Sequence, residues 1–245
     1  MKTRRAWLSA LWLLPVPLLA QAPPVITMDQ ETHHKLAMKN NFVKVFEIEL
    51  APGDAIAMHR HDHDEVSIVL DGATIVSTTP GQADVLTIAK AGDVSFERSG
   101  MVHSIRNIGQ TAFRSFAIDL QRSQTGARNL CGKQIPDLKP ECPAAVEADS
   151  TGSPLDLPQF ETDQVRVTLT RVRPQQQAKF GESGRDDLIV TMDEAAIVVS
   201  AGKGAASNQT LASGSPVWIP RRGSGRVLKN ISDKELRVLT IAFKP

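Results

Sequence analysis

Tyrosine is absent from the chain, and aromatic side chains make up only 4% of its 245 residues. An excess of either charge is also lacking, because 28 lysines and arginines face 27 aspartates and glutamates, a formal net charge of +1. Nucleic-acid binding uses a basic surface or aromatic platforms for base stacking, so this composition argues against such a partner. At 41% hydrophobic and 22% charged residues, the chain is nevertheless too apolar to be disordered. Its length suits one large domain or two ordinary ones.

Long apolar runs are absent except for one near the start. Ala6–Ala20 is mostly apolar, follows three basic residues and ends in the small-residue exit Ala20-Gln21-Ala22. This order predicts a signal peptide over residues 1–22, removed after Ala20 or Ala22. An uncleaved anchor is the alternative, although the run is short for a bilayer span. We expect a periplasmic or secreted protein with no membrane association after signal removal, and the three lost positive charges bring its net charge to about −2.

Cysteine is scarce, with only Cys131 and Cys142, eleven positions apart in a segment rich in proline and charge. In an oxidising compartment this pair predicts a disulfide that closes a loop. Two free thiols that never meet are the alternative. A metal site built on the cysteines is not expected, because no histidine follows His103.

Short alternating runs broken by glycine, proline and aspartate extend from Phe42 to Leu120, which is typical of an all-β sandwich or barrel. A shift of 122 residues, or 123 after one inserted residue, lays this pattern on the second half of the chain. Core and turn residues then coincide in both halves, which indicates an internal repeat. The domains are therefore expected at 23–120 and 159–245, joined by a linker over 121–158 that contains the disulfide.

Histidine is concentrated in the first half, where His59, His61 and His103 accompany Glu65. Residues two apart on a strand share a face, so His59 and His61 point the same way, and Glu65 can join them after a bend. Three imidazoles and one carboxylate suit a divalent transition metal such as Mn, Fe, Ni, Co or Zn, rather than Ca or Mg. A solvated loop of histidines and aspartates is the alternative on local sequence alone.

The spacing of these residues resembles both signature motifs of the cupin superfamily. The first motif is Gly53-x5-His59-x-His61-x3-Glu65-x6-Gly72, and the second runs from Gly92 through Gly100 and His103 to Asn107, with Arg98 where proline is usual. The resemblance covers nearly all of residues 40–120 and, more faintly, 160–245.

This resemblance implies two tandem cupin barrels, each an all-β double-stranded β-helix or jelly roll. It implies one divalent transition metal per chain, Mn or Fe favoured, held inside the first barrel. His59, His61, Glu65 and His103 match the metal-binding positions. Gly53, Gly72, Gly92 and Gly100 match turn positions that favour glycine.

The second copy lacks this ligand set. At the corresponding positions the sequence comparison places Gly181, Ser183, Asp187 and Arg226. One carboxylate and a cation cannot hold a transition metal, so we interpret residues 159–245 as a degenerate cupin domain without metal.

Three further histidines and two charged residues lie near the motifs without matching a ligand position. We interpret His33 and His34 as an exposed tail before the first strand, with a cap on the barrel mouth as the alternative. His63 matches no ligand position and is expected to be solvated. Glu97 and Arg98 are the candidates nearest in sequence for an acid or base beside the metal.

The leading functional hypothesis is an exported metalloenzyme of oxidoreductase, dioxygenase-like type that acts on a small oxygen-bearing molecule. Glu65 would serve as a ligand and as a catalytic base. A non-catalytic metal-dependent binding protein for a small acid or sugar is one alternative, and a cupin isomerase, decarboxylase or lyase is another. Bicupins often pair through edge strands, so the resemblance also leaves a homodimer open. Fold alone does not separate these hypotheses.

Overall fold

The computed structural model describes residues 24–142, 155–181, 184–201, 206–222 and 225–245. The predicted signal peptide and Ser183 lie outside the described residues. Within these ranges the only helix is one short 3-10 turn, η1 (Met28–Gln30), and the ordered elements are otherwise β-strands. None of the described segments forms a helix long and apolar enough to cross a membrane. The predicted all-β fold is confirmed.

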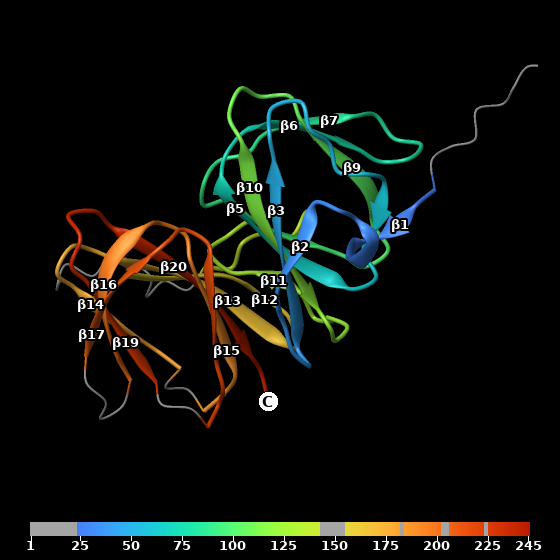
Figure 1. The fold of residues 1–245 in the computed structure, drawn as a ribbon. Coiled ribbons are helices and arrows are strands. Elements are labelled where there is room, and N and C mark those ends of the chain that lie inside the picture. Colours follow the sequence, from blue (N-terminus) through green and yellow to red (C-terminus); the bar gives the residue numbers. More distant parts are fainter. Residues whose placement is uncertain (1–23, 143–154, 182–183, 202–205, 223–224) are drawn as a thin grey trace, which may run out of the picture.

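The first half of the chain forms a barrel from two five-stranded sheets, drawn in blue to green in Figure 1. One sheet has the order β1-β4-β9-β6-β7 and the other β2-β3-β10-β5-β8. The strands are β1 (Ile26–Thr27), β2 (His34–Lys39), β3 (Val43–Leu50), β4 (His59–Arg60), β5 (Asp64–Asp71), β6 (Thr74–Thr78), β7 (Val85–Ile88), β8 (Val94–Glu97), β9 (Val102–Asn107) and β10 (Phe113–Leu120).

The second half forms a similar barrel, drawn in yellow to red in Figure 1. Its sheets have the orders β11-β12-β13-β20-β15-β18 and β14-β19-β16-β17. The strands are β11 (Arg128–Asn129), β12 (Leu155–Glu161), β13 (Val165–Val172), β14 (Gln177–Phe180), β15 (Asp187–Thr191), β16 (Ala195–Ala201), β17 (Ser207–Leu211), β18 (Ser215–Ile219), β19 (Arg226–Asn230) and β20 (Leu236–Phe243). Strand β13 repeats β3 at an offset of 122 residues, and β20 repeats β10 at an offset of 123, as the internal repeat predicts.

One hydrophobic core lies between the two barrels. There the β2-β3-β10-β5-β8 sheet of the first barrel faces the six-stranded sheet of the second. Alternation along β10 shows how one strand serves two cores. Phe113 and Ala117 face the interior of the first barrel, whereas Phe116, Ile118 and Leu120 face the second barrel. Residues of β12, β13, β15 and β20 complete this interbarrel core. Central strands such as β10 and β15 are therefore buried on both faces, which explains why their apolar runs are nearly continuous.

Two glycines allow close approach of backbone segments around the first barrel. A Cβ atom on Gly72 would lie 2.4 Å from the carbonyl oxygen of Ala89, so any residue other than glycine would clash with the backbone there. Gly92 has a φ of +99°, and a Cβ there would collide with the guanidinium of Arg237 from the second barrel. Arg237 Nη1 donates a hydrogen bond to the oxygen of Ala91 at 3.1 Å, so this turn is also a contact between the barrels.

The segment between the barrels is tied down by a disulfide and by one buried amide. Cys131 and Cys142 are bonded, as predicted. The side chain of Asn129 is fully buried and donates hydrogen bonds to the oxygens of Ile135 and Leu138, both at 2.8 Å. Strand β11 and the start of β12 lie inside the stretch predicted as a linker.

We predict that Phe116→Ala lowers the free energy of unfolding by about 3–5 kcal/mol, because it opens a cavity in the interbarrel core. Leu86→Ala on β7, where Leu86 is 64% exposed, is the matched control and should change stability by no more than about 0.5 kcal/mol. Urea unfolding followed by intrinsic fluorescence and circular dichroism measures both. Equal losses in the two variants would show that the interbarrel core does not carry the stability assigned to it.

Candidate metal centre

Three of the predicted ligands meet inside the first barrel. His59 lies on β4 and pairs directly with His103 on β9, while His61 follows β4 by one residue. The Nε2 atom of His61 lies 3.2 Å from Nε2 of His59 and 3.0 Å from Nε2 of His103. All three side chains are buried. The local strand pairing therefore brings three imidazole nitrogens to one point, as a metal ion requires.

The protonation state of these imidazoles also suits a metal. Nδ1 of His59 lies 3.0 Å from the carbonyl oxygen of Ala57, which can only accept, so this nitrogen carries the proton and Nε2 offers its lone pair. Burial lowers the pKa of all three histidines, and together with the repulsion of neighbouring imidazoles it brings the pKa of His61 to about 3 and that of His103 to about 4. The three rings are therefore neutral near pH 7.

One buried and one partly buried carboxylate lie at the opposite edge of the His61 ring. Glu65 on β5 pairs across the sheet with Glu97 on β8. Their Oε2 atoms lie 3.3 Å and 3.9 Å, respectively, from Nδ1 of His61. The structure thus places Glu65 beside the three-imidazole cluster rather than within it, and it adds Glu97 to the same place.

The carboxylate pair is held in an environment that disfavours charge. Burial raises the pKa of Glu65 well above its ordinary value, and the carboxylates of Glu97 and Asp119 raise it further. Burial also raises the pKa of Glu97. Oε2 of each glutamate, like Nδ1 of His61, is buried without a hydrogen-bond partner in the described part of the chain. Unpaired buried acceptors next to three neutral imidazoles fit a divalent transition metal by their donor chemistry.

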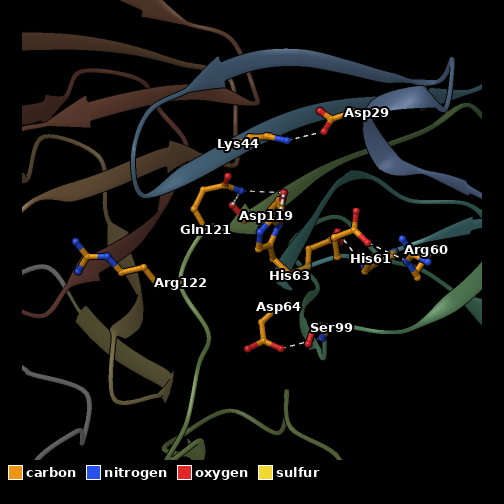
Figure 2. A network of polar contacts seen from close by, with 12 residues as sticks. Asp29, Lys44, Arg60, His61, His63, Asp64, Ser99, Asp119, Gln121 and Arg122 are labelled. Carbon is orange, nitrogen blue, oxygen red and sulfur yellow. Dashed lines mark hydrogen bonds and ion pairs between the residues drawn. The ribbon is translucent and has the colours of Figure 1, made fainter.

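His63 takes part in a different contact at the surface. Its Nδ1 lies 3.0 Å from Oδ1 of Asp119, and the amide of Gln121 donates to Oδ2 of the same carboxylate at 3.0 Å (Figure 2). The His63 side chain is 37% exposed and is not among the residues that line the cavity. It lies outside the three-imidazole cluster.

The interpretation of His33 and His34 as an exposed tail is wrong for His34. Its side chain is buried, lines the cavity, and lies edge-on to His59 with ring centroids 4.9 Å apart. Nδ1 of His34 lies 2.9 Å from Oε2 of Glu31, a buried carboxylate that sequence reasoning missed. The signal was weak, because Glu31 precedes the first histidine of the cluster by 28 residues and belongs to no motif.

Glu31 is ionised, unlike the carboxylates inside the cavity. Burial raises its pKa, but hydrogen bonds from His34, His33 and the backbone N–H of Ala57 outweigh this effect and bring the pKa down to about 2. It therefore carries a full negative charge close to the metal centre.

A cavity of about 560 Å³ adjoins the cluster. Glu97, a candidate acid or base from the sequence, lines it, whereas Arg98 does not and instead donates to the oxygen of Gln124 at 2.7 Å. Gln134 of the segment between the barrels also reaches the cavity wall. The other lining residues are His34, Ile48, Ile56, His59, His61, Glu65, Ser67, Val69, Ile75, Ser77, Thr87, Ala89, Gly92, Asp93, Val94, Ser95, Met101, His103, Ile105, Phe113 and Ser115.

The second barrel corrects one position of the sequence comparison. Gly181 was placed at the position of His59, and this is wrong by one residue, because Phe180 pairs with Arg226 as His59 pairs with His103. The first barrel holds one extra residue between Ala55 and His59, where its ladder bulges. Phe180 is buried in the core of the second barrel.

The remaining counterparts in the second barrel follow from the same registers. Asp187 takes the position of Glu65, and Ile219 lies opposite it where Glu97 lies opposite Glu65. Within the described residues, the groups of three or more candidate ligands all belong to the first barrel.

Comparisons with known proteins agree with this architecture. A family model described as "Cupin domain" matches residues 46–119. Over 85 residues, 34% of this chain, the sequence is 32% identical to the oxalate-binding protein of Thermotoga maritima and covers 67% of it. AerE from Microcystis aeruginosa aligns with a TM-score of 0.57 at 10% identity, over 88% of this chain and 99% of that one. Salicylate 1,2-dioxygenase from Pseudoaminobacter salicylatoxidans aligns with a TM-score of 0.57 at 11% identity, over 89% of this chain and 75% of its own.

We predict one transition-metal ion per chain, and that His61→Ala removes most of it, because His61 is the imidazole that contacts both of the others. Asp187→Ala in the second barrel is the matched control and should leave the metal content unchanged. Elemental analysis by mass spectrometry on protein purified from its native compartment measures both. Two ions per chain, or loss of metal on changing Asp187, would contradict the assignment to the first barrel.

Proposed function

This chain belongs to the cupin family as a two-barrel member, and on that premise we propose that it is an exported metalloenzyme of oxidoreductase type. Its first barrel would hold one divalent transition metal and act on a small oxygen-bearing acid in the adjoining cavity. His59, His61 and His103 would hold the ion. Glu65, whose carboxylate lies beside His61 and outside the three-imidazole cluster, would have to turn toward the ion to act as the fourth ligand. When bound, such an ion would supply Lewis acidity and, if it is Mn or Fe, redox chemistry.

The observation that carries the enzymatic part of the proposal is the position of Glu65 and Glu97. The two carboxylates face each other across β5 and β8, both line the cavity, and each has a buried oxygen without a partner. Holding a small acid without turnover requires no second carboxylate at this place, whereas acid–base chemistry could use one. Glu97 would be the additional acid or base beside the metal, and its position supports catalysis over simple binding.

The size and lining of the cavity support the proposed substrate class. Its volume of about 560 Å³ suits a small molecule, and its walls combine apolar side chains with serine and threonine hydroxyls. A small carboxylic acid could chelate the ion through its oxygens while hydroxyls of the wall bind the rest. The name of the oxalate-binding relative and the gentisate adducts of the salicylate dioxygenase point to the same class of ligand.

A metal-dependent binding protein is the second candidate, because the relative of 32% identity is named for oxalate binding. It would use the same three histidines and the same cavity. The two candidates differ in whether a bound acid is converted.

Export is part of the proposal and is supported by two features. The start of the sequence has the order of a signal peptide, and the disulfide between Cys131 and Cys142 is of a kind that persists in oxidising compartments. We place the mature protein in the periplasm or outside the cell.

We predict that the metal-replete protein converts at least one small acid in a screen of oxalate, salicylate, gentisate and related hydroxy acids. The screen is run with and without dioxygen, and the protein is loaded in turn with Mn and Fe. Oxygen uptake and product analysis measure turnover, and calorimetry measures binding. An acid that binds without any product would establish the binding protein and exclude the enzyme for that acid. Absence of both would remove the proposed substrate class.

We predict that metal-loaded Glu65→Gln keeps its ion and loses at least about 100-fold in rate, because the amide keeps the shape but removes the basic oxygen. Glu97→Gln should also keep the ion and lose rate. Asp187→Asn, at the position of Glu65 in the second barrel, is the control. Metal content and initial rates are measured on the same samples. If metal and activity fall in proportion in Glu65→Gln, Glu65 is a ligand only.

A further inference from the structure

We propose that residues 26–34 form a clasp over His59, and that Glu31 is the residue in this clasp that positions the imidazole for metal binding. The inference rests on the proposed metal site in the first barrel. It concerns binding of the ion and not turnover. The clasp comprises β1, η1 and the start of β2, and it lies outside both signature motifs.

The backbone of the clasp holds the strand that carries His59. Strand β4 is two residues long, and its partner on one side is β9. On the other side β1 pairs with it in parallel, with Ile26 opposite His59, and the N–H of Ile26 donates to the oxygen of Met58 at 3.2 Å. Without β1, the strand carrying this ligand would be an edge of the sheet.

Glu31 is linked to His59 through one intervening residue, Ala57. Its Oε1 accepts a hydrogen bond from the N–H of Ala57 at 3.2 Å. The carbonyl oxygen of the same Ala57 accepts the Nδ1–H of His59 at 3.0 Å. Because a proton fixed on Nδ1 leaves the lone pair on Nε2, the carbonyl of Ala57 selects the tautomer that can bind a metal, and Glu31 holds the residue that carries this carbonyl.

Glu31 is itself held by the two histidines that follow it. Oε2 accepts from Nδ1 of His34 at 2.9 Å and from the N–H of His33 at 2.7 Å, while Nδ1 of His33 lies 3.1 Å from Oε1. The ring of His34 then packs against that of His59. The carboxylate is thus linked to His59 in two ways, through the hydrogen bonds of Ala57 and through the ring of His34.

The charge of Glu31 indicates what the clasp is for. Its side chain is 2% exposed, and in the described part of the chain its ion pairs are with His33 and His34 only. A buried anion without a lysine or arginine partner is costly, and a divalent cation nearby would offset this cost.

The test compares Glu31→Gln with Asp29→Asn in the full mature chain. Asp29 belongs to the same clasp, but its side chain is exposed and pairs with Lys44 at the surface (Figure 2). The dissociation constant for Co²⁺ is measured by competition with a chelator, and visible absorption reports the coordination. Nitrogen NMR of the metal-free protein reports the tautomer of His59, and thermal unfolding reports the fold.

Glu31→Gln should weaken Co²⁺ binding by about 10–100-fold, the usual effect of removing a partner of a metal ligand. Its metal-free His59 should lose the single Nδ1–H tautomer, while Asp29→Asn should stay within about twofold of the wild type. Equal affinities in Glu31→Gln and the wild type, or an equal loss in Asp29→Asn, would overturn the inference.

Should Glu31→Gln fail to fold, His33→Ala tests the same link more gently, because it removes one contact to Oε1 and leaves the carboxylate in place. A loss of a few fold in Co²⁺ affinity is expected, and no loss would count against the clasp. If the wild-type protein binds no transition metal at all, the proposed function fails instead, so the two failures are distinguishable.

Discussion

Burial of single strands on both faces is the constraint on which the rest of the structure depends. Along β5, Val66, Ile68 and Leu70 pack against the second barrel, while the alternate positions, beginning with Glu65, line the cavity. A slip of one residue would exchange these two sets and place Glu65 in the apolar interface, at a cost far greater than that of a slip in an exposed strand. The interbarrel core therefore fixes the register in which the first barrel presents its polar groups.

The second barrel has the same strand arrangement as the first but a different interior. Phe180 stands at the position of His59 and Ile219 at that of Glu97, and both belong to a compact apolar core. The interior of the first barrel contains buried polar side chains, whereas the interior of the second is packed with apolar ones. Apolar packing contributes more to stability than buried polar groups do. Its six-stranded sheet packs against the β2-β3-β10-β5-β8 sheet of the first barrel, and Arg237 contacts the turn at Ala91. The second barrel thus acts as a scaffold for the first.

The sequence predicted those features that depend on short-range patterns. Strand alternation, the repeat and the spacing of the motifs were enough for the fold and for the meeting of His59, His61 and His103. The sequence could not predict contacts made across strands or by distant segments, such as Glu97 facing Glu65, or Glu31 reaching Ala57. The error at Gly181 has the same origin, because a one-residue bulge between Ala55 and His59 changes the pairing without leaving a gap in the sequence pattern.

The pKa values of three glutamates in the first barrel are shifted in opposite directions. Glu31 accepts hydrogen bonds from two backbone N–H groups and two imidazoles, and this lowers its pKa although it is buried. Glu65 and Glu97 have few donors and lie next to each other. Burial raises the pKa of both, and repulsion by Glu97 and Asp119 raises that of Glu65 further. An ionised carboxylate beside the imidazole cluster favours a cation there, and carboxyl groups of raised pKa inside the cavity suit proton transfer. The division of labour in the proposed enzyme therefore follows from how many donors each carboxylate meets. Burial also raises the pKa of Asp187 in the second barrel, but Ile219 lies opposite it where Glu97 lies opposite Glu65.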